Sequence, residues 1–285
     1  MRKIMHWMLT AILCICGASI FTSCSNDNND NPADAETGAP AIEGLAEKMM
    51  GKWTLADLNG KPAPTNSKFV TTFTSATKGY MSASFNKYAD TELNTIWNDR
   101  QEFEYTITGN VVTMTSKVDE HLTTIDELTV TSISDEETCG ILKIKWMADG
   151  TVVKTAEETV RTVKTTEDYT EAALGLWKGH VTSEQSEYDD GEDHRWEYKA
   201  DGTYTYYNRT ADGQWVDNVN SFGAYFIDGT LLCMRWKNVG SDIEYREWWE
   251  IESISDGVMK WKALRLREDG STYTATFQMT KVEKE

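Results

Sequence analysis

Positive charge is scarce in this sequence. It has 28 Lys and Arg residues against 46 Asp and Glu residues, which gives a formal net charge of −18 at pH 7 with neutral histidines. A surface this acidic is repelled by phosphate backbones and by anionic lipid head groups. The charge therefore excludes nucleic acid as a partner.

The residues that most often build catalytic and metal sites are also few. After the first 23 residues the histidines are His121, His180 and His194, and none has the spacing of a zinc site. The chain has no glycine-rich phosphate loop and no Gly-x-Ser-x-Gly nucleophile motif. Carboxylates are so numerous that no glycosidase-type pair stands out. We therefore expect a protein that is not an enzyme, with no catalytic residue, no bound metal and no cofactor.

Two weaker possibilities concern residues 180–194. His180 and His194 fall at the end of one expected strand and the start of the next, so they can approach each other, although solvated loop residues are the simpler interpretation. Residues 184–193 between them carry six Asp and Glu side chains. This loop lacks the alternating acidic order of a helix-loop-helix calcium site, which favours a solvated acidic loop over calcium binding.

The N-terminus has the pattern of a bacterial lipoprotein precursor. Two basic residues precede an apolar run from Ile4 to Phe21, and small residues stand directly before Cys24. Residues 1–23 are therefore interpreted as a signal peptide, too short for a stable membrane span. Thr22-Ser23-Cys24 resembles the lipobox of lipoproteins, which implies lipidation of Cys24 and anchorage to the outer membrane, facing the cell exterior. Residues 24–44 are polar, acidic and without aromatics, as in a flexible tether.

Cysteine is almost absent after this point. Cys139 and Cys233 remain, one in each half of the chain and at non-equivalent positions. A disulfide between them would require two domains to dock with these sites together, so two free, buried thiols are the simpler interpretation.

The rest of the chain contains one unit twice. Gly51-Lys52-Trp53 matches Gly175-Leu176-Trp177 at an offset of 124, and Tyr105–Gly109 matches Tyr225–Gly229 at an offset of 120. The sequence Ser-Ile-Ser-Asp at 132–135 recurs at 253–256, and Asp-Gly at 149–150 recurs at 269–270. Order and spacing are both kept, so we expect two domains of one fold, at 45–165 and 166–285.

Each unit alternates apolar and polar residues with period two, between turn signals about every 8 to 12 residues. This pattern predicts eight strands per unit, which in the second unit are 176–182, 194–200, 203–209, 221–228, 230–238, 242–254, 258–267 and 271–282. Three-residue loops at 200–202 and 268–270, each with glycine last, place apolar residues opposite one another. They pair Trp196 with Tyr206, Tyr198 with Tyr204, and Trp261 with Phe277.

An eight-stranded meander with one apolar face can bury that face by closing into a barrel, which also removes exposed sheet edges. We therefore predict an all-β protein of two tandem eight-stranded antiparallel up-and-down barrels. The short helix-forming run, the Gly-x-Trp and the meander that follows resemble the lipocalin family, and more narrowly the lipocalin-like domains of Bacteroidota lipoproteins. The resemblance implies that Trp53 and Trp177 close the barrel floors against basic residues of the last strands, Arg161 and Lys281.

Aromatic residues are the remaining functional signal. The second unit is rich in Trp, and Trp196, Tyr198, Tyr204, Tyr206 and Trp249 are candidates to line a pocket, although aromatics more often fill a core. Trp248 and Trp249 must point to opposite faces of their strand, so one faces outward, with docking against the other barrel as the default. The expected function is binding of a small apolar or aromatic-stacking ligand in the second barrel. The alternative is an accessory or scaffold protein that engages another envelope protein or a polysaccharide through exposed aromatics.

Overall fold

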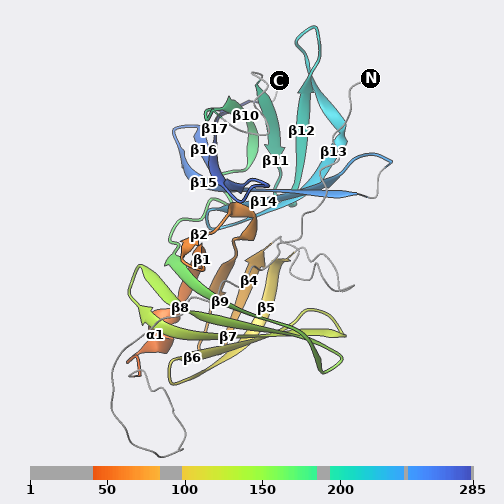
Figure 1. Cartoon of the computed structure of the whole chain (residues 1–285). Helices are drawn as coiled ribbons and strands as arrows, with labels where there is room; N and C mark the ends of the chain where they lie inside the picture. Colours follow the sequence, from red (N-terminus) through yellow and green to blue (C-terminus); the bar gives the residue numbers. More distant parts are fainter. Residues whose placement is uncertain (1–40, 84–97, 185–192, 241–242, 284–285) are drawn as a thin grey trace, which may run out of the picture.

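The protein consists of two closed antiparallel β-barrels in tandem and contains almost no helix (Figure 1). The computed structural model describes residues 41–83, 98–184, 193–240 and 243–283. Cys24 and the tether up to residue 40 lie outside these residues, whereas Ile42, near the end of the expected tether, packs against the core of barrel 1. None of the described helices has the length and apolar character that a bilayer crossing requires.

Barrel 1 closes through pairing of its first and last strands. The strand order is β2-β1-β3-β4-β5-β6-β7-β8-β9, and β9 pairs back onto β1, so that β2 is a short ninth strand on the rim of an eight-stranded barrel. Its elements are α1 (Leu45–Met49), β1 (Gly51–Leu58), β2 (Lys61–Pro62), the 3-10 turn η1 (Thr65–Ser67), β3 (Val70–Phe73), β4 (Lys78–Ala83), β5 (Asn98–Thr108), β6 (Val111–Lys117), β7 (Leu122–Ile133), β8 (Glu137–Ala148) and β9 (Thr151–Lys164).

Barrel 2 is a closed meander of eight strands, each neighbouring the next in sequence. They are β10 (Gly175–Val181), β11 (His194–Tyr198), β12 (Thr203–Arg209), β13 (Trp215–Asp228), β14 (Leu231–Lys237), β15 (Glu244–Ser255), β16 (Val258–Leu266) and β17 (Thr272–Val282). The predicted strand count and order are confirmed. One strand differs in extent: β13 begins at Trp215, six residues before the predicted start at 221.

The predicted turns set the register of barrel 2. Trp261 pairs with Phe277 across the turn at 268–270, and Trp196 pairs with Tyr206 across the turn at 200–202. Gly202 and Gly270 have φ of 78° and 81°, a left-handed conformation that glycine adopts without steric cost. These registers turn the apolar residues of both hairpins inward, as the sequence predicts.

The two barrels repeat details of the floor as well as strand order. The indole Nε1 of Trp53 donates to the carbonyl of Met49, and that of Trp177 donates to the carbonyl of Ala173, both at 2.7 Å. Met49 ends helix α1, whereas Ala173 belongs to a hydrogen-bonded turn. The floor of each barrel thus contains a buried tryptophan whose indole is hydrogen-bonded to the residue four positions upstream.

The basic partner of each floor tryptophan comes from the last strand. The Lys281 ammonium lies 5.3 Å from the ring centre of Trp177, the pairing that the resemblance implies. In barrel 1 the partner is Lys164, 5.2 Å from the ring centre of Trp53, and not Arg161. Arg161 lies on the outer face of β9, where it donates to Asp57 and to Glu137 at 2.6 and 3.2 Å. Lys164 takes the place expected for Arg161 because the last strand of barrel 1, β9, has 14 residues, whereas the last strand of barrel 2, β17, has 11.

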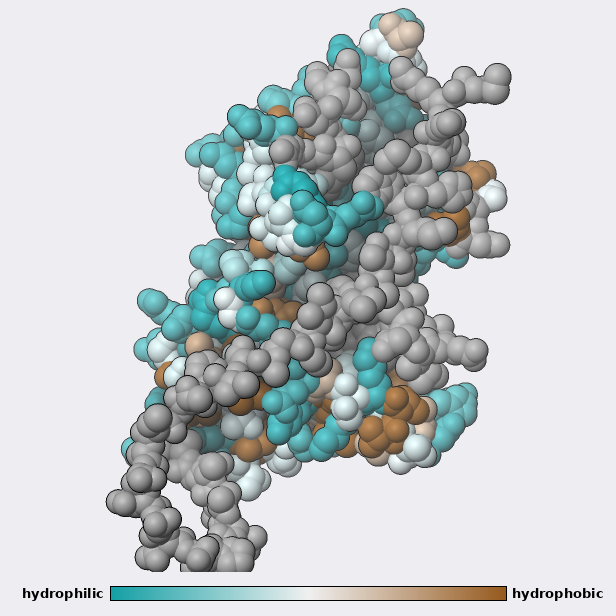
Figure 2. Space-filling model, viewed as in Figure 1, coloured by the Kyte–Doolittle hydropathy of each residue, from teal (hydrophilic) through white to brown (hydrophobic). Residues whose placement is uncertain are grey.

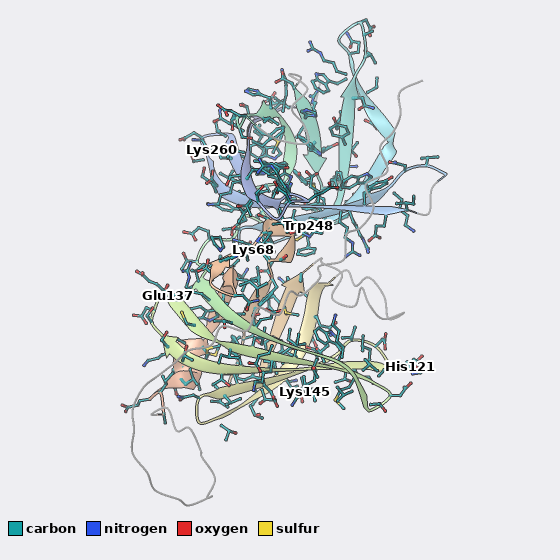
Figure 3. All side chains as sticks on the ribbon, viewed as in Figure 1. Lys68, His121, Glu137, Lys145, Trp248 and Lys260 are labelled. Atoms are coloured by element: carbon teal, nitrogen blue, oxygen red, sulfur yellow. The ribbon has the colours of Figure 1, made fainter. Side chains whose placement is uncertain are left out.

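The barrels pack directly on each other through what we call the junction, formed by buried Val70, Leu231 and Cys233 with Phe226 and Trp248 packed against them. Val70 lies on the outer face of β3, and the other four lie on the outer faces of β13, β14 and β15. Figure 3 shows Trp248 and Lys68 where the barrels meet. Trp248 is thus the outward tryptophan of its pair, and it docks against the other barrel as predicted.

Buried ion pairs border the junction. Lys52 of β1 pairs with Asp228 at 2.5 Å, and the Asp228 side chain is only 4% exposed. The Ser82 hydroxyl donates to the same carboxylate at 2.5 Å, and Lys68 pairs with Glu250 at 2.7 Å. Burial by itself lowers the pKa of Lys52, but hydrogen bonds and charges from Asp228 and the nearby Asp168 outweigh it and raise the pKa. Apolar contact and ion pairing therefore hold the barrels together.

Candidate functional site

The interior of barrel 2 is a packed aromatic core. Trp196, Tyr198, Tyr204 and Trp249 are at most 4% exposed and belong to one cluster with Trp261 and Phe277. Ring centres lie 5.4 Å apart for Trp196 and Phe277 and for Trp249 and Trp261, and 4.9 Å for Tyr198 and Tyr225. Such contacts are those of a close-packed core.

Four of the five candidate pocket residues are therefore core residues, which corrects that interpretation. They point inward as predicted, but neighbouring rings occupy the space between them. Gly223 contributes to this packing, because a Cβ atom there would lie 2.0 Å from the ring of Tyr204. Burial raises the pKa of Tyr198 well above its ordinary value, and the charges of Tyr204 and Glu247 add to the effect. Tyr206 is the one candidate that reaches a pocket.

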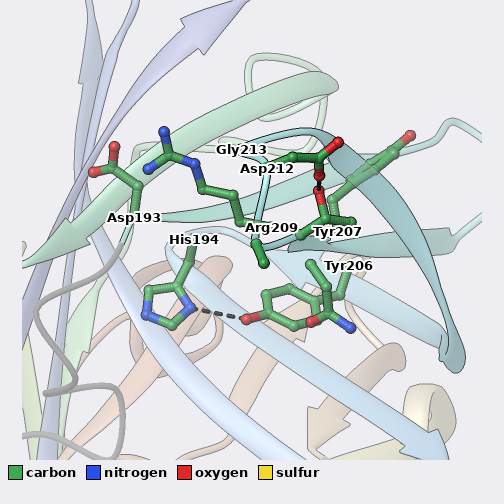
Figure 4. A pocket seen from close by; sticks show the side chains of 10 residues that line it. Asp193, His194, Tyr206, Tyr207, Arg209, Asp212 and Gly213 are labelled. Atoms are coloured by element: carbon green, nitrogen blue, oxygen red, sulfur yellow. Dashed lines mark hydrogen bonds between the residues drawn. The ribbon is translucent and has the colours of Figure 1, made fainter.

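A pocket of about 850 Å³ lies at the end of barrel 2 where β11 begins and β12 ends (Figure 4). Its base is formed by His194 and Tyr206, whose Nδ1 and hydroxyl are 2.9 Å apart. The remaining lining residues come from the end of β12 and the loop that follows, with one residue from before β11: Asp193, Tyr207, Asn208, Arg209, Thr210, Ala211, Asp212 and Gly213. We call this group the rim pocket.

The two carboxylates of the rim pocket already have partners. Asp193 pairs with Lys178 at 3.0 Å and with His180 at 3.4 Å. Burial raises its pKa, but the hydrogen bonds and charges of these partners prevail and lower it. Asp212 accepts a hydrogen bond from the hydroxyl of Thr210, which lowers the pKa of Asp212. Both acids are held as carboxylates at neutral pH.

An arginine lies between two aromatic rings beside the rim pocket. The Arg195 guanidinium is 5.8 Å from the ring centre of Tyr207 and 5.6 Å from that of Trp215, within cation–π range. Tyr207 donates to Glu197 at 2.7 Å. Burial, and then this bond, raise the pKa of Tyr207. Trp215 stands opposite Arg209, because the β12–β13 ladder shifts register between Thr205 and Tyr207.

The histidines and cysteines considered from the sequence do not form a shared site. His180 is exposed and pairs with Asp193, whereas His194 is buried against Tyr206, so each imidazole has its own partner. Cys139 and Cys233 are free thiols, and only Cys233 is buried. Residues 185–192 of the acidic loop lie outside the described residues. In the described part of the chain, no three His, Cys, Asp or Glu side chains are grouped to hold a metal ion.

Sequence reasoning named Asp193 only as part of the acidic loop 184–193, and it did not single out Tyr207 or Arg209. The signal that points to them is the end of β12, where Tyr206, Tyr207, Asn208 and Arg209 follow one another directly before the turn residues Asp212 and Gly213. A run of aromatic, amide and guanidinium groups at a strand end is a combination suited to binding.

Comparisons with known proteins assign no family. No protein-family model and no curated protein matches the chain. Among solved structures, it is similar to a double mutant and a single mutant of the vaccine antigen transferrin binding protein B from Haemophilus parasuis, each with 12% sequence identity and a TM-score of 0.22. The match covers 82% of this chain and 59% of the other, so this chain spans less than two thirds of that protein's length. A likeness at this TM-score assigns neither a family nor a function.

Proposed function

We propose that the chain is a lipid-anchored lipoprotein of the outer membrane, exposed at the cell surface, whose two lipocalin-like barrels serve binding and not catalysis. The signal peptide and the lipobox-like residues before Cys24 support the anchor. Cys24→Ser tests it. Wild-type protein should incorporate labelled fatty acid and fractionate with the membrane, whereas the variant should lose both properties. A variant that keeps the label and stays with the membrane contradicts the anchor.

The ligand of this protein binds at the rim pocket of barrel 2 and is a sugar ring of a glycan. The observation that supports this proposal is a pocket of about 850 Å³ at the open end of a barrel whose interior is filled by its own aromatic residues. Tyr206 and Tyr207 supply ring faces, and Asn208, Arg209 and Asp212 supply donors and acceptors for hydroxyl groups. A small apolar ligand inside barrel 2 is less favoured, because it would have to displace packed tryptophans.

Calorimetric titration of the mature chain with a panel of oligosaccharides tests this function. Tyr207→Ala should weaken binding about tenfold, as expected for the loss of one aromatic contact. Tyr80→Ala is a matched control, because Tyr80 of barrel 1 also carries an arginine, Arg100, at 4.8 Å from its ring centre. The control should bind like the wild type. Absence of binding across the panel, or equal affinity of Tyr207→Ala and wild type, would refute a glycan site here.

An envelope protein is a second candidate partner, favoured by one observation. Val239, Ile243 and Leu266 are 70%, 58% and 52% exposed at the same end of barrel 2. Exposed aliphatic side chains on neighbouring loops are typical of protein contacts. Replacing Val239 and Ile243 by Ser should abolish cross-linking to an envelope protein in cells and leave sugar binding unchanged. Unchanged cross-linking would argue against this candidate.

A further inference from the structure

Arg195 is a cation buried between two aromatic rings. It is 8% exposed, and its Nε atom is buried without a hydrogen-bond partner. Its guanidinium lies over the rings of Tyr207 and Trp215, and among the described residues no carboxylate forms an ion pair with it. Removing a guanidinium from water without pairing it is unfavourable, so a stable protein retains such a residue where a ligand completes the site.

Comparable cations elsewhere in the chain are paired. Lys52 and Lys68 at the junction meet Asp228 and Glu250, and Arg265 inside barrel 2 meets Glu247 at 3.5 Å. The protein has 46 acidic residues, so an unpaired buried arginine does not reflect a shortage of carboxylates. The carboxylates nearest in sequence have other partners. Asp193 pairs with Lys178, and Glu197 accepts the hydroxyl of Tyr207.

A second arginine lies on the neighbouring strand at the same rim. Arg209 ends β12, lines the rim pocket and is exposed, and in the described part of the chain it has no ion pair. Tyr207 lines the pocket, stacks with Arg195 across β11 and β12, and stands two residues before Arg209. Because alternate residues of a strand share a face, Arg195, Tyr207 and Arg209 lie on the same outer face at this end of barrel 2.

We propose that the rim pocket, together with Arg195 and Trp215 on the outer face beside it, binds a carboxylate-bearing sugar, with Arg195 and Arg209 pairing with the carboxylate and Trp215 packing against the ring. This inference rests on the proposed function, which it narrows to acidic glycans. A guanidinium matches a carboxylate through two parallel hydrogen bonds. Phosphate monoesters carry more charge than a carboxylate and are disfavoured by Asp193 and Asp212 in the same pocket. Those two acids, with Asn208, suit the hydroxyl groups of the ring.

The test compares acidic sugars with uncharged counterparts. The mature chain is titrated with oligosaccharides that contain glucuronate, galacturonate or sialic acid, and with their methyl esters, which keep the ring and lose the charge. The acid forms should bind roughly 10- to 100-fold more tightly, the range for hydrogen bonds to a charged group. The preference should shrink as salt is raised. Equal affinity for acids and esters overturns the inference and leaves the proposed function standing. Absence of binding by every sugar removes both.

Variants separate a binding role from a structural one. Arg195→Leu should lose the preference for the acid while its thermal midpoint stays unchanged or rises, because an unpaired buried charge is removed. Arg100→Leu is the matched control in barrel 1, where the arginine also stacks on a tyrosine. A midpoint for Arg195→Leu below that of the control shows a structural role and overturns the inference. Arg209→Leu, at an exposed position, should also lose the preference, and unchanged affinity there counts equally against the inference.

Competition by an acidic peptide tests whether the site binds an acidic protein segment instead of a sugar. Oligoglutamate offers carboxylates without a sugar ring, and it should compete weakly, because the packing surface of Trp215 is then unused. If oligoglutamate binds and no acidic sugar does, the partner is an acidic protein segment and the sugar proposal is overturned.

Discussion

Replacing Lys52 by Met tests how the barrels are held together. The substitution leaves Asp228 at the junction with its side chain 4% exposed and its ion pair gone. Breaking a buried ion pair from one side costs about 3 to 5 kcal/mol. Ser82 still donates to the remaining carboxylate, so we expect the lower end, about 3 kcal/mol, or a thermal midpoint lower by roughly 6 to 12 °C.

The assay is a urea titration followed by tryptophan fluorescence, with Lys143→Met as the matched control. Lys143 pairs with Glu157 at 3.4 Å, but both side chains are more than half exposed, so its loss should cost about 1 kcal/mol or less. Adding Asp228→Leu to Lys52→Met should restore most of the lost stability, because the orphaned charge is removed as well. The reasoning is refuted if Lys52→Met costs no more than the control, or if the double variant is less stable than Lys52→Met alone.

Three further predictions concern pH, the junction and the core of barrel 2. The pKa of Lys52 is raised above 10.5 in the folded state, so its contribution to stability is complete below pH 10.5 and is lost as pH rises through the folded pKa. The difference in unfolding free energy between wild type and Lys52→Met, measured by urea titration, should therefore narrow only in that alkaline range. A difference that disappears near neutral pH contradicts the pairing. Trp248→Ala should destabilise the protein by about 3 kcal/mol in the same titration, through loss of an aromatic packed at the junction, and an unchanged midpoint would show that the barrels do not depend on this contact. Gly223→Ala should cost about 1 to 3 kcal/mol in a thermal melt, since its Cβ would meet the ring of Tyr204 at 2.0 Å, and a variant as stable as wild type would mean that the ring is free to move.

The fold of barrel 2 was predictable because two independent signals agree. Period-two alternation gives the face of each side chain, and turns that require glycine fix the register between strands. A register one residue away would have placed Lys260 and Lys262 in the interior, so Trp261 had to pair with Phe277, as it does. The outward direction of Trp248 follows from the same alternation.

The floor of barrel 1 was mispredicted for a local reason. A constant offset of 120 from Lys281 leads to Arg161, but the turns before the last strands differ in length. Asp149-Gly150 is a two-residue turn, in which Ala148 pairs with Thr151, whereas 268–270 is a three-residue loop. The longer β9 then places Lys164 beneath Trp53. Repeats conserve the order of elements more strictly than the offset between them.

The binding site was the least predictable part. Alternation shows that Trp196 and Trp249 face inward, but it does not show whether neighbouring rings leave space between them. That depends on packing among residues far apart in sequence, such as Trp196 and Phe277. The rim pocket also depends on the start of β13 at Trp215 and on the register shift beside Tyr207, which no turn signal in the sequence indicates.

Hydrogen–deuterium exchange with and without a bound oligosaccharide tests most directly whether recognition takes place at the rim of barrel 2. With the tightest-binding sugar of the panel at saturation, we expect added protection in residues 193–197 and 206–215, and no change in β16, β17 or barrel 1. Protection confined to the strands around Trp249, Trp261 and Phe277 would place the ligand inside the barrel and contradict the account.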